Sequence, residues 1–282
     1  KNGEFCGKNK ANNLIQYNVH NPLLLLNRKF GFRMFMLVAS TNPLIAYYHD
    51  GYLRLSIDPY NSNSKDRTTF VTNIGLSMKE AKDNLFDGMS DEEIQEYTCW
   101  YLDQLQTYLL EKGLIQDPNW LDNYLRPQFK KAMIHLLRMS QSEFFKKSSL
   151  FEFYGLDFVM DDQMGVWFIE ANAIPLIHGF TDRTAKKFDQ MMVDTFEIVY
   201  GLLRSRMKRA VEYINDLSKK IAKTGSKVIP NLRGRREEFK ELTMNNFEIE
   251  YLPRQGNGFI KIVDENQLGI DRYSGLLESE CF

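Results

Sequence analysis

Three oxygen-bearing side chains near the middle of the chain have a spacing that suits a divalent cation. Aromatic and aliphatic residues flank the turn sequence Asp-Asp-Gln-Met-Gly (residues 161–165), a pattern that predicts a β-hairpin. The register that buries the apolar face places Asp157 directly opposite Glu170. Asn172 projects from the same face as Glu170, because the side chains of a strand alternate. The other face then carries only apolar side chains: Leu156, Phe158, Met160, Trp167, Ile169 and Ala171.

Two carboxylates that face each other across a β-ladder repel, so one of them takes a proton or a cation lies between them. Ligands that offer only oxygen favour Mg²⁺, which proteins commonly hold with one or two carboxylates, several waters and phosphate oxygens. The alternative is that Asp157 and Glu170 are solvent-facing strand carboxylates paired with nearby Lys or Arg side chains. Spacing alone leaves both interpretations open.

The elements around this hairpin predict a sheet covered by amphipathic helices. Patterns typical of strands cover residues 30–39, 44–57, 68–74, 149–160 and 166–173. Patterns typical of helices cover residues 90–113, 120–145 and 184–222, the first of them opening with the capping sequence Ser-Asp-Glu-Glu. From Thr224 onward no stripe of helical length persists, and we expect a tail that folds onto another part of the molecule or stays partly loose.

Composition narrows the class of protein. The 282 residues are 43% hydrophobic and 26% charged, which is typical of a folded globular protein of one large or two modest domains. The formal net charge of −1 predicts no nucleic-acid partner and no anionic membrane for the chain as a whole. No apolar run approaches the ~18 residues that a membrane helix needs. The widely spaced Cys6, Cys99 and Cys281 indicate neither a disulfide framework nor a zinc site, which favours a reducing, cytoplasmic compartment.

Several motifs, in order along the chain, resemble those of the tubulin tyrosine ligase-like family. The hairpin sequences Phe-Tyr-Gly-Leu-Asp-Phe (153–158) and Val-Trp-Phe-Ile-Glu-Ala-Asn-Ala-Ile-Pro (166–175) resemble that family's metal-binding hairpin. Residues 22–33, 37–44, 52–54 and 72–73 also follow the family order, so that the resemblance covers roughly residues 14 to 200. It implies an α+β, ATP-grasp-like fold with an antiparallel sheet flanked by helices. Residues 1–222 would be a partial catalytic domain with an incomplete N-terminal lobe, and residues 223–282 an extended C-terminal tail, with a docking segment as one expectation.

The resemblance also implies an activity and roles for individual residues. The family uses ATP and Mg²⁺ to form an acyl phosphate and to join an amino acid to tubulin. The expected partners are therefore tubulin or the microtubule and an amino-acid substrate, and the expected location is the cytoskeleton and the cilium. By resemblance, Asp157, Glu170 and Asn172 hold Mg²⁺, Lys29 and Arg33 act on the phosphates and the acyl phosphate, and Arg54 binds the amino-acid carboxylate. Thr72 and Asn73 line the same pocket, and Gln16 lies near the adenine.

The chain departs from the family pattern at the same site. It reads Lys29-Phe30-Gly31-Phe32-Arg33, where the family usually has an Asp at the position of Gly31. Tyr17 replaces a common Lys or Arg, and no His precedes Thr72. The glycine-rich segment that covers the phosphates in the family precedes Gln16, where only fifteen residues remain. Either the chain is a fragment whose true start lies upstream, or the protein has lost this segment.

Two functions follow from these observations. One is an active tubulin amino-acid ligase of the glutamylase, glycylase or tyrosine ligase type. The alternative is a catalytically impaired family member that serves as a structural, microtubule-binding component of a ciliary axoneme, in which Arg33 and Arg54 are ordinary surface cations of the sheet. The basic stretch over residues 204–209 is either a contact for acidic tubulin tails or a solvated helix face.

Overall fold

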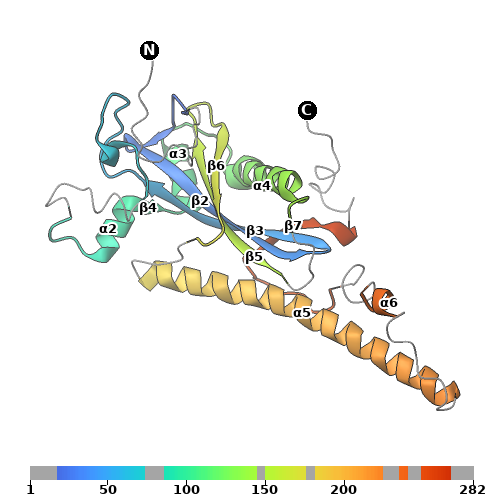
Figure 1. Cartoon of the computed structure of the whole chain (residues 1–282). Coiled ribbons are helices and arrows are strands. Elements are labelled where there is room, and N and C mark those ends of the chain that lie inside the picture. The colour runs from blue at the N-terminus through green and yellow to red at the C-terminus, as the bar shows by residue number, and fades with distance from the viewer. Residues whose placement is uncertain are drawn as a thin grey trace, which may run out of the picture.

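An antiparallel sheet of seven strands forms the centre of the computed structural model (Figure 1), which describes residues 18–73, 86–144, 150–175, 182–224, 235–240 and 249–267. The order along the sheet is β4-β3-β2-β5-β6, with β1 paired to β2 and β7 paired to β3. The strands are β1 (Leu24–Leu25), β2 (Arg28–Thr41), β3 (Leu44–Leu55), β4 (Cys99–Trp100), β5 (Glu152–Met160), β6 (Val166–Asn172) and β7 (Ile260–Asp264). The predicted α+β class with an antiparallel sheet is confirmed.

Helices cover both faces of the sheet. The described helical elements are η1 (Arg67–Thr69), α2 (Asp91–Thr98), α3 (Leu102–Glu111), the π-helical turn η2 (Leu121–Leu125), α4 (Arg126–Ser140), α5 (Asp182–Thr224), α6 (Arg236–Lys240) and η4 (Glu265–Gln267). The apolar sides of α3, η2 and α4 pack on one face of the sheet, and the first half of α5 packs on part of the other (Figure 1). No helix in the described ranges is both long enough and apolar enough to cross a membrane.

The central strand β2 shows how one sequence serves both faces. Phe30, Phe32 and Met34 point toward α3 and α4 and are almost fully buried in the larger apolar cluster. Phe35 and Leu37 belong to the second cluster, which α5 covers. Because side chains alternate along a strand, Lys29 and Arg33 fall on the α5 side, ahead of the apolar residues that α5 covers. This geometry leaves room for a site.

The hairpin β5–β6 has the predicted pairing at its functional positions and a different one nearer the turn. Asp157 lies opposite Glu170, as the sequence predicts. Beyond that pair the register shifts, because Ile169 forms a bulge and Phe158 then pairs with Phe168. The prediction that Trp167 and Ile169 face the core is therefore wrong, whereas Ala171 keeps its predicted place opposite Leu156 but is exposed. Trp167 and Ile169 are partly exposed, and Phe168 packs on the core instead.

Two predicted elements near the site are also wrong. The helix expected over residues 90–113 is two helices, because Cys99 and Trp100 pair with β3 as the short strand β4. The capping box at Ser90 and Glu93 is present. The strand expected over residues 68–74 is absent from its described part, where η1 forms on an Asp66 cap that accepts the backbone N–H of Thr68.

After the hairpin, helix α5 leads away from the sheet, and a later segment of the chain returns to it. The helical pattern of residues 184–222 corresponds to one continuous helix of 43 residues. Residues 249–267 return to the sheet, where β7 pairs with β3 and buries Ile262 and Val263. Part of the tail thus folds onto the sheet, while the division at residue 222 and the docking role stay predictions.

Candidate functional site

Three charged side chains from neighbouring strands meet on the α5 side of the sheet. Arg33 of β2 and Asp157 of β5 are partners in the ladder. Nε of Arg33 donates to Oδ1 of Asp157 at 2.5 Å, and Nη2 donates to Oδ2 at 3.0 Å. Nη2 of Arg54, on β3, lies 2.9 Å from the same Oδ2. All three side chains are nearly buried, so Arg33 and Arg54 are not surface cations.

The two guanidinium groups keep Asp157 ionised. Burial by itself would raise the pKa of this carboxyl, because it disfavours the charged form. The hydrogen bond from Arg33 and the positive charges of Arg54 and Arg33 outweigh burial, so the pKa of Asp157 lies below its usual value. The carboxylate is therefore a fixed anion at neutral pH, and part of its capacity to accept bonds is already used.

Gly155 provides the space in which Arg33 lies. A Cβ atom at this position would come within 2.7 Å of the Pro175 side chain and 3.0 Å of Cδ of Arg33. Such contacts are too short for carbon atoms, so a larger residue would push the guanidinium away from Asp157. The sequence Tyr-Gly-Leu-Asp thus carries its glycine for a steric reason that spacing alone did not reveal.

A cavity of about 360 Å³ lies next to this cluster. Lys29, Arg54, Thr72 and Asp157 line it, which brings together four of the side chains singled out from the sequence. The sequence analysis missed its other walls, which include Asn18, Val19, Phe70, Val159 and Ile169.

The two basic groups of this cavity have capacity to bind a ligand. Burial lowers the pKa of Lys29, and within the described chain its amine has no carboxylate partner, only the ring of Tyr60 at 6.0 Å. Nε of Arg54 is buried and has no hydrogen-bond acceptor among the described residues. A buried donor without a partner is costly, so both groups favour an anionic ligand.

The remaining predicted site residues lie at different distances from the cavity. Asn73 is exposed and does not belong to the described lining, and Gln16 and Tyr17 lie outside the described residues. Gly31 is in the wall, and a Cβ atom there would lie 3.3 Å from both Oγ1 of Thr72 and the backbone oxygen of Phe158. Even a methyl group at this position is therefore tight, because both Thr72 and the backbone of Phe158 would have to shift by a few tenths of an ångström.

Two of the predicted magnesium ligands, Glu170 and Asn172, lie on the edge strand β6 beside the buried cluster, and we call this place the hairpin edge. Glu170, opposite Asp157, is exposed, and its Oε1 accepts a bond of 3.2 Å from Nδ2 of Asn172. A carboxylate offers about four lone-pair positions, and the arginines take three on Asp157. Glu170, the amide oxygen of Asn172 and one position on Asp157 thus fit an ion that needs few protein ligands. No group of three or more His, Cys, Asp or Glu side chains suited to a metal ion occurs in the described part of the chain.

Comparison with known proteins places this arrangement in a family. A family model described as "Tubulin-tyrosine ligase family" matches residues 4–209. The chain belongs to the tubulin-tyrosine ligase family. The match covers the strands β1, β2, β3, β5 and β6, and therefore all of the cluster, the cavity and the hairpin edge.

Several curated relatives of the chain carry glycylase names. The chain is 26% identical over 200 residues to "Inactive polyglycylase TTLL10" of Homo sapiens, which covers 69% of the chain and 28% of the relative. It is 30% identical over 200 residues to "Tubulin glycylase 3C" of Tetrahymena thermophila, covering 70% and 18%. It is 29% identical over 194 residues to "Tubulin monoglycylase TTLL3" of Homo sapiens, covering 68% and 24%. The aligned segment thus spans less than a third of each of these three relatives.

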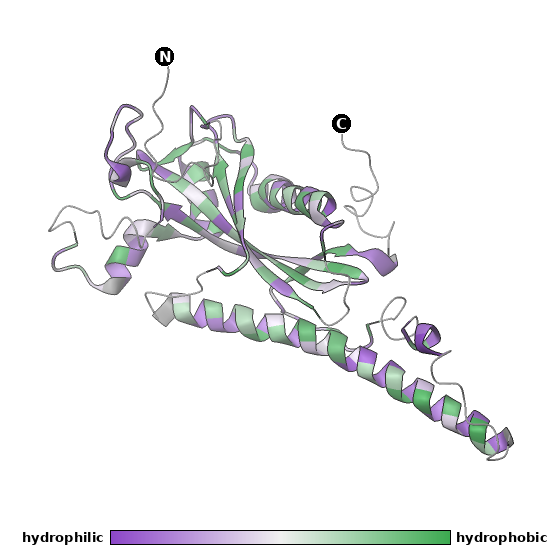
Figure 2. Cartoon of the chain, viewed as in Figure 1, coloured by the Kyte–Doolittle hydropathy of each residue, from purple (hydrophilic) through white to green (hydrophobic). Residues whose placement is uncertain are grey.

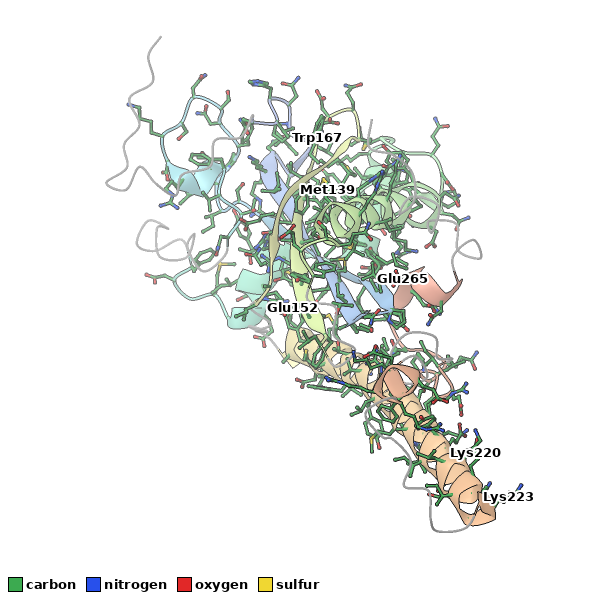
Figure 3. All side chains as sticks on the ribbon, turned by 45° about the vertical axis from the view of Figure 1, so that its right-hand side comes forward. Met139, Glu152, Trp167, Lys220, Lys223 and Glu265 are labelled. Carbon is green, nitrogen blue, oxygen red and sulfur yellow. The ribbon has the colours of Figure 1, made fainter. Side chains whose placement is uncertain are left out.

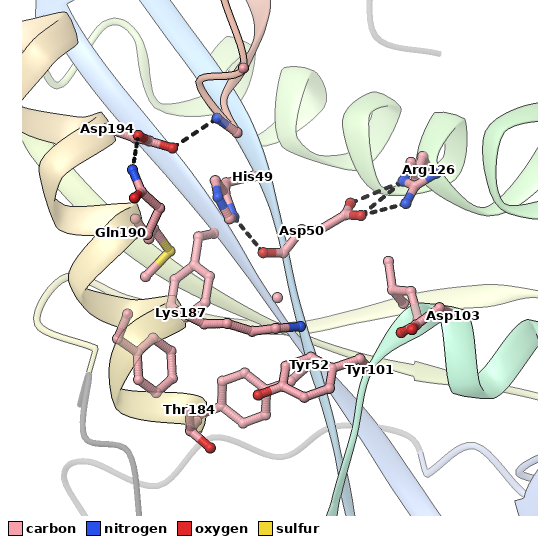
Figure 4. Close-up of a pocket in the computed structure, with 17 residues that line it drawn as sticks. His49, Asp50, Tyr52, Tyr101, Asp103, Arg126, Thr184, Lys187, Gln190 and Asp194 are labelled. Atoms are coloured by element: carbon pink, nitrogen blue, oxygen red, sulfur yellow. Dashed lines mark hydrogen bonds and ion pairs between the residues drawn. The ribbon is translucent and has the colours of Figure 1, made fainter. Parts of the chain in front are cut away.

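This family member has a second cavity, of about 430 Å³, at the edge of β3 between the residues that pair with β7 and those that pair with β4 (Figure 4). Tyr52, which pairs with Arg33 across the ladder, lies between the charged cluster and this cavity. Lys187 of α5 extends into it, with its amine 3.3 Å from the centre of the Tyr101 ring. The sequence analysis missed this cavity, because its walls come from β2, β3, α3, α4, α5 and the segment before β7.

Most charges in the second cavity are compensated. Asp50 is held by Arg126 through three hydrogen bonds of 2.6 to 3.1 Å. Asp194 accepts bonds from Arg254, Gln190 and the backbone N–H of Gly258. Burial lowers the pKa of His49, so this ring is neutral at physiological pH. Arg126 and Lys187 are the two cations among the described residues that line this cavity.

Proposed function

We propose that this chain carries part of the active site of an ATP- and Mg²⁺-dependent ligase that joins an amino acid to tubulin. One observation carries the proposal: a single cavity brings together an amine, an open arginine donor and a carboxylate from the hairpin edge. Membership of the tubulin-tyrosine ligase family supports the substrate and the reaction class. Because the chain aligns with only a minor part of its relatives, the activity is proposed for the longer protein to which such a segment belongs.

The hairpin edge would hold the metal ion. Glu170 and Asn172 are the accessible ligands, and Asp157 shares its remaining position. When bound, Mg²⁺ would supply positive charge that offsets the negative charge developing during phosphoryl transfer. The amine of Lys29 would meet the phosphates from within the cavity, where burial strengthens each charge–charge interaction.

The two arginines would have different tasks. Arg33 directs two of its N–H groups at Asp157, so we propose that it positions this carboxylate for the metal. Only Nη2 of Arg54 is bonded to Asp157, its Nε has no acceptor among the described residues, and the side chain lines the cavity, which suits the carboxylate of an amino acid. The glycylase names of the relatives support glycine as that amino acid.

The second cavity would receive the acceptor chain. It lies at the edge of β3, and its wall includes Tyr52, whose ladder partner Arg33 belongs to the charged cluster. Lys187 would pair with a carboxylate of the acidic acceptor, and Tyr52 and Tyr101 would contact its apolar parts. Tubulin as the partner implies a place on the cytoskeleton, and we extend this expectation to the cilium.

Calorimetric titration of the full-length protein with Mg-ATP tests the metal and nucleotide site. We expect binding that disappears in Glu170→Gln and persists in Glu152→Gln, a matched exposed carboxylate on the same hairpin. Binding that survives in Glu170→Gln would remove the hairpin edge from the proposal. Absence of binding in folded full-length protein would contradict the ligase function itself.

The composition of the cavity wall also supports a second candidate, a family member without catalysis that binds microtubules as a structural component. Its supporting observation is Gly31, which places no carboxylate where the family pattern has one. One relative is itself described as an inactive polyglycylase. Gly31→Asp separates the two candidates, since a gain of glycine incorporation into tubulin in this variant alone would favour the structural role for the natural chain.

A further inference from the structure

Strand β3 presents apolar side chains to the larger cluster from two different sets of positions. In its first half the buried residues of that cluster are Leu44, Ala46 and Tyr48, and in its second half they are Leu53 and Leu55. Each set follows the alternation of a strand, but the two sets are out of step by one residue. Figure 2 shows apolar and polar residues interchanging along the strands of the sheet. The strand therefore contains one extra residue between its two halves.

The extra residue lies in a β-bulge. The register between β2 and β3 shifts between residues 33 and 35 of β2. At this place two residues of β3, Asp50 and Gly51, lie opposite the single residue Met34. Because the side-chain period of a strand is two, one inserted residue turns every side chain after it to the other face.

The bulge decides on which face Arg54 lies. Directly after the bulge, Tyr52 faces α5, where its ring centre lies 5.8 Å from that of Phe188. Two residues farther along, Nη2 of Arg54 reaches Oδ2 of Asp157 at 2.9 Å. Without the extra residue, alternation would turn Arg54 toward the apolar cluster and Leu53 toward the charged one. The convergence of charges at the site thus depends on the bulge.

Glycine is the only residue that fits at position 51. A Cβ atom there would lie 1.8 Å from the backbone oxygen of Arg33 and 2.9 Å from its carbonyl carbon. Backbone atoms cannot rotate away as a flexible side chain can, so a larger residue would push β3 away from β2 or displace the bulge. Either movement would carry Tyr52 and Arg54 with it.

Asp50 holds the bulge from the side of α4. Its Oδ1 accepts a hydrogen bond of 2.6 Å from the hydroxyl of Tyr48. Arg126 donates from Nε at 3.0 and 3.1 Å and from Nη2 at 2.6 Å. Arg126 is the first residue of α4, the helix that carries Met139 and lies on the other side of the sheet from α5 (Figure 3). A guanidinium that engages both carboxylate oxygens fixes direction as well as distance, so this contact ties the bulge to the helix.

We propose that Asp50 and Gly51 are positioning residues for Arg54, and that the bulge they form sets the affinity of the site for the carboxylate of its amino-acid substrate. Neither residue belongs to the described lining of the cavity of about 360 Å³, so both act through Arg54. The statement about affinity rests on the proposed function, in which Arg54 binds this carboxylate. The statement about position does not, since it concerns the unliganded chain.

Nuclear magnetic resonance of the full chain tests the position of Arg54 without a ligand. Nε of Arg54 is buried, so its N–H group should give a slowly exchanging signal, which is assigned by its loss in Arg54→Lys. Asp50→Asn and Gly51→Ala should each shift this signal and speed its exchange with water by at least about fivefold, because the bulge no longer holds the guanidinium in place. Asp122→Asn is the matched control, since Asp122 is an exposed carboxylate bound to the same Arg126, and it should leave the signal unchanged.

Steady-state kinetics of glycine incorporation into tubulin test the effect on affinity. Asp50→Asn should raise the KM for glycine about tenfold, while kcat and the KM for Mg-ATP change less than about twofold, because only the partner of the glycine carboxylate has moved. A general loss of structure would instead lower kcat and weaken both substrates together. Asp122→Asn should leave all three constants within about twofold of the wild type.

Thermal unfolding shows whether each variant is folded, and Asp50→Asn alone decides the question if Gly51→Ala does not fold. An unchanged Arg54 signal in folded Asp50→Asn would overturn the proposal. Parallel losses in kcat and in the KM values of both substrates would also overturn it. A wild-type protein that transfers no glycine would contradict the proposed function and the statement about affinity, and the Arg54 signal would still decide the statement about position.

Discussion

The two faces of strand β2 require different kinds of residues, one of them apolar throughout and the other partly charged. Toward α3 and α4, Phe30, Phe32 and Met34 form an uninterrupted apolar surface that any residues of similar volume would maintain. Toward α5, the same strand presents Lys29, Gly31 and Arg33 and becomes apolar only from Phe35 onward. The first face specifies the fold and the second specifies the site. Helix α5 covers β2 only from Phe35 onward, and the cavity beside the charged cluster lies over the residues of β2 that precede it.

The largest effect on stability is expected on the apolar face. Phe32 is fully buried and its ring lies 5.1 Å from that of Phe129. Phe32→Ala should lower the free energy of unfolding by about 3–5 kcal/mol, because it leaves a cavity in a close-packed core. Urea denaturation measures this loss. A loss below about 1 kcal/mol, the scale of an ordinary surface change, would mean that this face does not carry the fold.

Asp157→Asn should be the most costly change on the site face. It leaves two nearly buried guanidinium groups without their anion, at a cost of about 3 kcal/mol near neutral pH. The pKa of Asp157 is lowered in the folded chain, so its contribution is present above the ordinary pKa of about 3.9 and is lost as the pH falls through the lower, folded value.

Urea denaturation at several pH values checks both parts of this prediction. The difference between wild type and Asp157→Asn should narrow as the pH falls below about 4. Asp162→Asn, an exposed carboxylate in the same hairpin, serves as the control and should show little difference at any pH. A gap that widens in acid would contradict the assigned ionisation of Asp157.

Gly155→Ala is expected to have an intermediate effect, of about 1–3 kcal/mol, because the added methyl group overlaps Pro175 and Arg33. Gly31→Ala should cost less, since its nearest neighbours are 3.3 Å away and need to shift by only a few tenths of an ångström. Thermal unfolding of both variants measures the two losses of stability. Their ratio shows whether the space at Gly155 is more restricted than the space at Gly31. Equal losses would mean that Arg33 does not depend on the space at Gly155.

Glu170→Gln should have the smallest effect on stability, within about 0.5 kcal/mol, because the side chain is exposed at the edge of the sheet. The same variant should lose Mg-ATP binding altogether. A parallel measurement of unfolding and of calorimetric binding separates the two readouts. A large loss of stability in this variant would show that Glu170 serves the fold rather than a ligand.

The site shows where prediction from sequence succeeds and where it does not. The pairing of Asp157 with Glu170 followed from alternation and burial, which act over a few residues. The bulge at Ile169 did not follow, because it depends on how Phe168 packs against Phe158 and the core. The break at Cys99 was missed for a similar reason, since its pairing partner Arg54 lies far away along the chain.

The sequence by itself determined the long strands β2, β3, β5 and β6, the helical character of the region after the hairpin, and the family, because periodicity and motif order are properties of the chain. Only the tertiary structure decided that Arg33 and Arg54 converge on Asp157, that a second cavity opens beside Tyr52, and that α5 leaves apolar side chains exposed. Each of these results depends on residues distant in sequence whose positions are set by strand pairing and by packing on the core. Local propensity carries no information about such contacts, because their energy exists only once the sheet has formed.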